Sequence, residues 1–178
     1  MHKVILCLLA GILAVLISAC GSRTSEDVAP ERVFAAIVPT DGAIGEIIQV
    51  SDPQGAVSAL YETFGNGNTE RVYQDRLYEV FGLDPNITVS ALAYVSDVTG
   101  GLRDIVIVEP APGKSDQVRE ALNQYTVTQA AAFRNYDILN AYSIATNAVI
   151  FYQGNYMVML MFPDNDAARV ILDQYIPN

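Results

Sequence analysis

The tripeptide Gly113-Lys114-Ser115 has the residue types that hold phosphate, because a P-loop ends in Gly-Lys followed by Ser or Thr. A P-loop also needs a first glycine five residues before Gly113, and that position is Val108. Pro110 and Pro112 remove backbone N–H donors from the segment that would surround the phosphate. The sequence therefore predicts a turn before a helix here, and not a nucleotide site.

The residue types that most often carry catalysis are missing after Cys20. The only histidine is His2 and the only other cysteine is Cys7, so the rest of the chain has neither imidazole nor thiol. This excludes a Ser-His-Asp triad, a cysteine nucleophile, a zinc site of histidine or cysteine, and a haem held by histidine. Carboxylate chemistry, as in glycoside hydrolases, stays open, but spacing singles out no pair among the 20 acidic residues.

Asp164-Asn165-Asp166 begins like a calcium-binding loop. The fifth position of such a loop would be Ala168 and the sixth Arg169, where a ligand and a glycine are needed. Asp164 is therefore predicted to cap a helix. We expect the chain to use no metal and no cofactor.

The charge of the chain bears on its partners. Ten basic and 20 acidic residues give a net charge of −10 at pH 7. A surface of this sign repels a phosphate backbone, so no nucleic-acid partner is expected.

The N-terminus predicts the location of the protein. Lys3 precedes an apolar stretch over residues 4–19, which suits a signal peptide and is shorter than the roughly 20 residues of a spanning helix. Ile17-Ser18-Ala19-Cys20 resembles the bacterial lipobox, in which the cysteine is lipidated and becomes the mature N-terminus. The alternative is an uncleaved anchor or an ordinary signal peptide with a chance cysteine.

These observations divide the chain into three parts. Residues 1–19 are a lipoprotein signal peptide, residues 20–30 are the lipidated Cys20 with a polar tether, and residues 31–178 are a single α+β domain. We expect the domain to be anchored by lipid to the cell membrane, on its extracytoplasmic face. Two acyl chains hold a protein there firmly, whereas one would be marginal.

Apolar spacing and capping residues predict the helices. Asp52 followed by Pro53 is typical of a helix start, and Gly65 of a helix end. Tyrosines on the apolar stripes, namely Tyr73, Tyr125 and Tyr175, are expected to pack in the core. The other predicted helical segments are residues 31–38, Thr69 to Gly82, Ser115 or Asp116 to about Asn135, Tyr136 to Thr146, and one that begins at Asp164 and includes Tyr175.

Four strands are predicted from alternation and turn residues. Ile87 to Val95 alternates, with Ile87, Val89, Ala91, Ala93 and Val95 on one face, and residues 104–108 follow after the turn at Gly100-Gly101. Residues 148–153 and 156–162 are joined by Gly154-Asn155, which is typical of a two-residue hairpin. The fold class is therefore α+β. A mainly antiparallel four-stranded sheet of two hairpins would have a long helix between them, a C-terminal helix and an N-terminal helical segment. Two of the strands are apolar on both faces, so the sheet needs cover on both sides, or a partner on one of them.

Several short segments between Leu77 and Tyr175 carry a family resemblance. They are Leu77 to Leu83, Ala93 to Ser96, Arg103 to Ile107, Gln129 with Phe133 and Tyr136, and Gly154 to Tyr156. In these segments the chain resembles an uncharacterised family of bacterial lipoproteins catalogued as domain of unknown function 4358. The family usually has an acidic residue before the second strand, which Asp104 supplies, and often an arginine where this sequence has Tyr125. The resemblance implies an exported lipoprotein and no particular activity.

Four residues are candidates for a binding or a structural role: Gln129, Tyr136, Asn155 and Tyr156. Gln129 is the strongly polar residue on an otherwise apolar helix stripe. Its amide either faces a ligand cleft or is buried and bonded to the backbone, and we favour the second because buried amides usually have partners. The expected function is a membrane-anchored module that binds an envelope partner or a small ligand without catalysis. The alternative is a carboxylate-based hydrolase of cell-envelope material.

Overall fold

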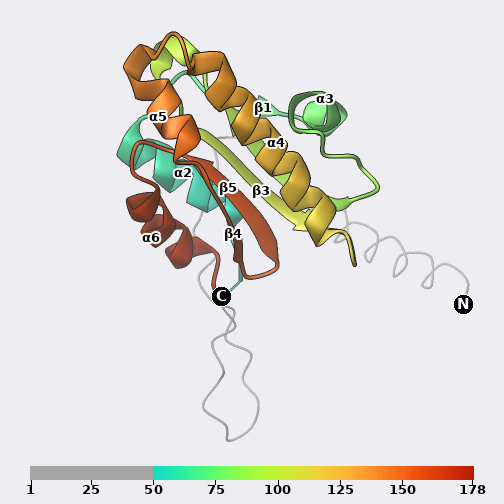
Figure 1. Cartoon of the computed structure of the whole chain (residues 1–178). Helices are drawn as coiled ribbons and strands as arrows, with labels where there is room; N and C mark the ends of the chain where they lie inside the picture. Colours follow the sequence, from blue (N-terminus) through green and yellow to red (C-terminus); the bar gives the residue numbers. More distant parts are fainter. Residues whose placement is uncertain (1–49) are drawn as a thin grey trace, which may run out of the picture.

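A computed structural model describes residues 50–178 (Figure 1). The predicted signal peptide, the lipidation site Cys20, the tether and the helix over residues 31–38 lie outside these residues. Among residues 50–178, no helix combines the length and the apolarity needed to cross a membrane.

The domain is built on one antiparallel sheet that has five strands, and not the four that the sequence predicts. Their spatial order is β1-β2-β3-β5-β4, so the strands of both predicted hairpins are neighbours and the hairpins join through β3 and β5. The α+β class is confirmed. The strands are β1 (Glu70–Val72), β2 (Thr88–Val95), β3 (Asp104–Pro110), β4 (Val149–Gln153) and β5 (Tyr156–Met161).

The additional strand corrects the predicted helix from Thr69 to Gly82. β1 pairs with the end of β2, where Glu70 lies opposite Val95. It is followed by the 3-10 turn η1 (Gln74–Arg76) and the short helix α3 (Leu77–Phe81). Tyr73, which was predicted to be in the core, is 64% exposed. A three-residue edge strand is too short to show an alternating pattern, so the helical spacing of the residues that follow concealed it.

Helices cover both faces of the sheet, which is the first of the two alternatives that the doubly apolar strands left open (Figure 1). One face carries α2 (Pro53–Phe64) and α6 (Asn165–Tyr175). The other face carries α3, α4 (Ser115–Phe133) and α5 (Ala141–Thr146). Two 3-10 turns, η2 (Val98–Gly100) and η3 (Ile138–Asn140), lie in the connections. The sheet therefore separates two hydrophobic cores.

The central strands contribute to both cores by strict alternation. On β3, Val106 faces the α4 side and Ile107 faces the α2–α6 side, and both are at most 1% exposed. On β5, Met159 and Leu160 divide in the same way. Burying a side chain of this size contributes about 1.5–3 kcal/mol. These two strands thus hold the layers together and fix the elements at the ends of the sheet.

β2 departs from the predicted alternation at one position. Val89 was expected on the core face, but it is 59% exposed. The pairing of β2 with β3 shifts register between Thr88 and Ser90, and Val89 lies at this irregularity. An irregularity of this kind turns one side chain away from its face without disturbing the rest of the strand.

The predicted helix caps and hairpin turn are confirmed. Asp52 accepts a hydrogen bond from the Gly55 N–H at 2.8 Å, and Asp164 accepts one from the Ala167 N–H at 2.9 Å. Gly154 has a positive φ of 56° in the turn between β4 and β5, a conformation that favours glycine. Short-range signals therefore place the starts of α2 and α6, and the turn between β4 and β5, correctly.

Candidate functional site

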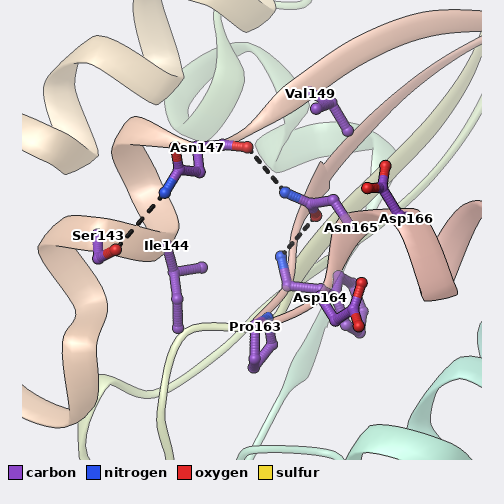
Figure 2. A pocket seen from close by; sticks show the side chains of 9 residues that line it. Ser143, Ile144, Asn147, Val149, Pro163, Asp164, Asn165 and Asp166 are labelled. Atoms are coloured by element: carbon purple, nitrogen blue, oxygen red, sulfur yellow. Dashed lines mark hydrogen bonds between the residues drawn. The ribbon is translucent and has the colours of Figure 1, made fainter.

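A pocket opens where α5 leads into β4 and where β5 leads into α6 (Figure 2). Its volume is about 360 Å³, which is at the lower end of the range for small-molecule sites. Ser143, Ile144 and Asn147 come from α5 and its C-terminal cap, and Val149 comes from β4. Residues 162–164 come from the β5–α6 connection, and Asn165 and Asp166 begin α6. Four elements from the second half of the chain therefore form one concave surface.

The inner wall of the pocket is apolar. Phe162 is 1% exposed and Ile144 is 8% exposed, and each belongs to the core on its own side of the sheet. Val149, at the start of β4, adds to this wall. Because these side chains are fixed by core packing, the floor of the pocket is rigid.

The polar rim is held together by Asn165, the first residue of α6 (Figure 2). Its side-chain oxygen accepts a hydrogen bond from the Phe162 N–H at 3.0 Å, and its amide nitrogen donates to the Asn147 carbonyl at 2.8 Å. Asn147 in turn donates from its side chain to the Ser143 hydroxyl at 3.5 Å. One side chain thus ties the end of α5 to the start of α6 and fixes the width of the pocket.

Two carboxylates, those of Asp164 and Asp166, complete the rim. Asp164 is the N-cap of α6, and one of its oxygens is occupied by the Ala167 N–H. Asp166 is exposed, and in Figure 2 the two carboxylates lie on opposite sides of Asn165. Among the described residues, no group of three or more histidine, cysteine, aspartate or glutamate side chains could hold a metal ion.

A second polar cluster, made of Ser96, Asp104 and Tyr125, is enclosed between the sheet and α4. One oxygen of Asp104 accepts from the backbone N–H and the hydroxyl of Ser96, at 2.7 and 2.6 Å. The other oxygen accepts from the hydroxyl of Tyr125 at 2.6 Å. Asp104 is 1% exposed and Tyr125 is 8% exposed. The cluster therefore links β2, β3 and α4 in the interior of the domain.

The charge state of this cluster follows from its burial. Burial raises the pKa of Asp104 above its ordinary value, and the hydrogen bonds from Ser96 and Tyr125 oppose part of that increase. Burial and the neighbouring Asp104 also raise the pKa of Tyr125, which stays a hydrogen-bond donor. A carboxyl with a raised pKa can be a catalytic acid, but Asp104 offers almost no surface to a substrate. Its position supports a structural role.

The loop between β2 and β3 closes over this cluster. The Arg103 N–H donates to the Ser96 hydroxyl oxygen at 2.9 Å. The Arg103 guanidinium group donates to the carbonyls of Phe64 and Gly100, at 2.8 and 2.7 Å. The cation therefore satisfies loop and helix-end carbonyls and forms no salt bridge with Asp104. Ser96 is the point at which this network meets the buried carboxylate.

The structure does not bring the four candidate residues of the sequence together. Gln129 lies in the last turns of α4 and is partly buried, and Tyr136 follows α4 and is 72% exposed. Asn155 is exposed in the β4–β5 turn, next to the partly buried Tyr156. In Figure 1 the turn and the end of α4 are at opposite ends of the sheet. None of the four residues lines the pocket.

The expectation that Gln129 is a buried, bonded amide is wrong. Gln129 is only partly buried, and among the described residues its side chain makes no hydrogen bond. The buried glutamine is Gln153, which is 3% exposed and donates to the Ile176 carbonyl at 2.6 Å. Helix periodicity could not reveal Gln153, because its partner lies beyond α6 at the C-terminus.

The sequence did not predict the pocket. Asp164-Asn165-Asp166 attracted notice as a possible calcium loop, and its capping role is confirmed. Ser143 and Asn147 are one helical turn apart, and no other pattern in the sequence marked them as site residues. Only the pairing of β4 with β5 brings these two segments together.

The comparisons with known proteins agree with the observed domain. The model of the family described as domain of unknown function (DUF4358) matches residues 62–162, from the end of α2 to the end of β5. No curated protein and no solved structure matches the chain. The match covers more than half of the 178 residues and includes the whole sheet, so the chain belongs to the DUF4358 family.

Proposed function

We propose that this protein is an extracytoplasmic lipoprotein, anchored to the cell membrane through Cys20, whose domain binds a partner or a small ligand without catalysis. The observation that supports binding is the pocket rim, in which Asn165 bridges the Phe162 N–H and the Asn147 carbonyl. Polar groups that are fixed in this way need no reorganisation when a ligand arrives, and this lowers the entropic cost of binding. Val149 and the exposed edge of Ile144 add a smaller apolar area that a ligand can cover.

The alternative, a carboxylate-based hydrolase, has weaker support. Such an enzyme places two carboxyl groups on either side of the bond that it cleaves, and the carboxyl that acts as the general acid usually has a raised pKa. In the described residues, the carboxyl whose pKa burial raises is Asp104, and Asp104 lies outside the pocket lining. The two aspartates that do line the pocket lie on opposite sides of Asn165 (Figure 2).

The anchor is tested by replacing the lipidated residue. Cys20→Ala should abolish the incorporation of radiolabelled fatty acid and should leave an unprocessed precursor in the membrane fraction. Cys7→Ala is the matched control, because Cys7 lies inside the predicted signal peptide and should not affect labelling. Unchanged labelling of the Cys20→Ala protein would overturn the proposed location.

Binding is tested on the mature chain with Cys20→Ser, which is soluble without the lipid. The ¹⁵N-labelled protein is titrated with soluble peptidoglycan fragments and followed by amide NMR, while the fragments are checked for cleavage. We expect shifts at Ser143, Asn147 and Asn165 and intact fragments, and Asn165→Ala should remove the shifts. Cleavage products that appear with the parent protein would support the hydrolase instead.

A further inference from the structure

The pocket presents more hydrogen-bond acceptors than donors. The Asn165 amide nitrogen is used by the Asn147 carbonyl, and the Phe162 N–H is used by Asn165. The Ala167 and Ala168 N–H groups at the start of α6 are used by the side chain and the carbonyl of Asp164. Several of the donors that could hold an anionic ligand are therefore occupied within the protein.

The free acceptors on the rim include negatively charged carboxylate oxygens. Asp164 keeps one carboxylate oxygen beyond its cap bond, and among the described residues Asp166 makes neither a hydrogen bond nor a salt bridge. No lysine, arginine or histidine is present among the described residues that line the pocket. A ligand that brings several donors and a positive charge matches this rim.

The inner wall adds a second requirement. Val149 and the exposed edge of Ile144 present hydrocarbon to the cavity behind the rim, and the buried Phe162 lies beneath them. A volume of about 360 Å³ accommodates a short alkyl chain but not a large ring system with its substituents. The ligand should therefore carry its charge beside a short apolar stem.

Building on the proposed binding function, we propose that this pocket binds a primary ammonium group carried on a short alkyl chain. The alkyl stem lies against Val149 and the exposed edge of Ile144, and the ammonium group donates to the free carboxylate oxygen of Asp164, while Asp166 adds negative charge to the rim. The same chemistry is offered by a lysine side chain of a partner protein and by a free alkyl diamine, so both sources are compared below.

The test uses three probes that share one stem and differ only in charge. n-Pentylammonium, 1-pentanol and pentanoate are titrated into the ¹⁵N-labelled mature chain with Cys20→Ser. We expect n-pentylammonium to shift the amide signals of Ser143, Asn147 and Asn165 and to bind about fivefold more tightly than 1-pentanol, which is typical of a partly exposed ion pair. Pentanoate should leave these signals unchanged.

Variants assign the preference to the rim. In Asp164→Asn with Asp166→Asn, the preference for ammonium over alcohol should disappear, while asparagine still caps α6. Asp173→Asn is the control, because Asp173 is exposed on the same helix and outside the pocket lining. Equal melting temperatures of the two proteins would show that only the site has changed.

A second pair of probes separates the two sources. Nα-acetyl-lysine methylamide represents a partner's lysine, and 1,5-diaminopentane represents a free diamine. Tighter binding of the first would assign the site to a protein partner, and tighter binding of the second to a small amine. Either result supports the proposal.

Three results overturn it, and they are distinguishable. If 1-pentanol or pentanoate binds as tightly as n-pentylammonium, the ligand class is wrong while the pocket remains a binding site. If none of the probes shifts the pocket signals but peptidoglycan fragments do, the ligand class is also wrong and the proposed function stands. If neither set of ligands shifts them, both proposals fail.

Discussion

Two aspartate clusters lie at the same end of the sheet and differ in almost every physical property. Asp104, at the start of β3, pairs in register with Met161, and Asp164 follows Met161 by three residues. Asp104 is 1% exposed and accepts three hydrogen bonds, whereas Asp164 is exposed and accepts one from the start of α6. The same residue type, aspartate, thus binds buried donors in the interior at one site and forms the rim of a pocket at the other.

The difference teaches that burial and donor supply, and not residue type, assign a role to a carboxylate. In the enclosed cluster every donor is directed at Asp104, so nothing is left for a ligand. In the pocket, the Phe162 N–H donates to Asn165, the Asn165 amide donates to the Asn147 carbonyl, and the Ala167 N–H donates to Asp164. None of these donors reaches Asp166, so its carboxylate is left free. Stability should therefore depend on the first cluster and ligand binding on the second. Substitutions in and outside the two clusters test this division.

The largest effect is expected for Asp104→Ala. The change leaves the Ser96 N–H and the Tyr125 hydroxyl without an acceptor in the interior, and each such buried group costs about 1–3 kcal/mol. We expect the free energy of unfolding to fall by about 2–4 kcal/mol in a urea titration. Because Asp104→Ala could prevent folding, Tyr125→Phe serves as a milder variant with a loss of about 1 kcal/mol. Parent-like stability of both variants would contradict the structural role.

A smaller effect is expected for Asn165→Ala in the pocket. The variant loses the bonds to the Phe162 N–H and the Asn147 carbonyl, but water at the pocket mouth can replace both partners. The free energy of unfolding should fall by about 1 kcal/mol, while the ligand response of the pocket should be lost. Asn123→Ala on the exposed side of α4 is the control and should change neither property. A loss as large as that of Asp104→Ala would erase the distinction between the clusters.

The sequence predicted those parts of the fold that depend on local patterns. The caps Asp52 and Asp164, the hairpin turn at Gly154 and the doubly buried β3 all follow from spacing within a few residues. β1 could not be predicted, because its evidence is the backbone pairing with β2 across the chain. Periodicity over Tyr73 to Phe81 favoured a helix, and only its last turns form one.

The same limit explains why the candidate site residues were misplaced. Gln129 was conspicuous because it interrupts an apolar stripe, yet it lies near the edge of the buried face of α4. Asn165 was hidden in a segment whose capping role already explained it. Its bond to the Asn147 carbonyl depends on where α5 ends relative to α6, and one sequence carries no measure of that distance.

A pH-dependent difference is expected for Asp104→Asn. Because burial raises the pKa of Asp104 above its ordinary value of 3.8, the folded protein retains a proton that the unfolded chain has lost between these two pKa values. The stability of the parent therefore falls as the pH rises through this window. Asparagine does not titrate, so the free energy of unfolding of the variant relative to the parent should rise with pH across the window and then level off.

At neutral pH this variant should be within about 1 kcal/mol of the parent, since asparagine keeps an acceptor for Ser96 while the Tyr125 hydroxyl can rotate to accept. The measurement is a series of urea titrations from pH 3 upwards. A difference in stability between Asp104→Asn and the parent that is independent of pH would mean that folding does not raise the pKa of Asp104.

The smallest effect is expected for Gln129→Ala, and Gln153→Ala is its matched comparison. Gln129 is partly buried and, among the described residues, makes no side-chain hydrogen bond, whereas alanine is a better helix former. Its replacement should change the free energy of unfolding by less than about 0.5 kcal/mol. Gln153→Ala removes the partner of the Ile176 carbonyl from a site that is 3% exposed, so it should cost about 1–3 kcal/mol. If the two variants exchanged these values, the polar group that stabilises the domain would be on α4 after all, and Gln129 would join the Asp104 cluster as a structural residue.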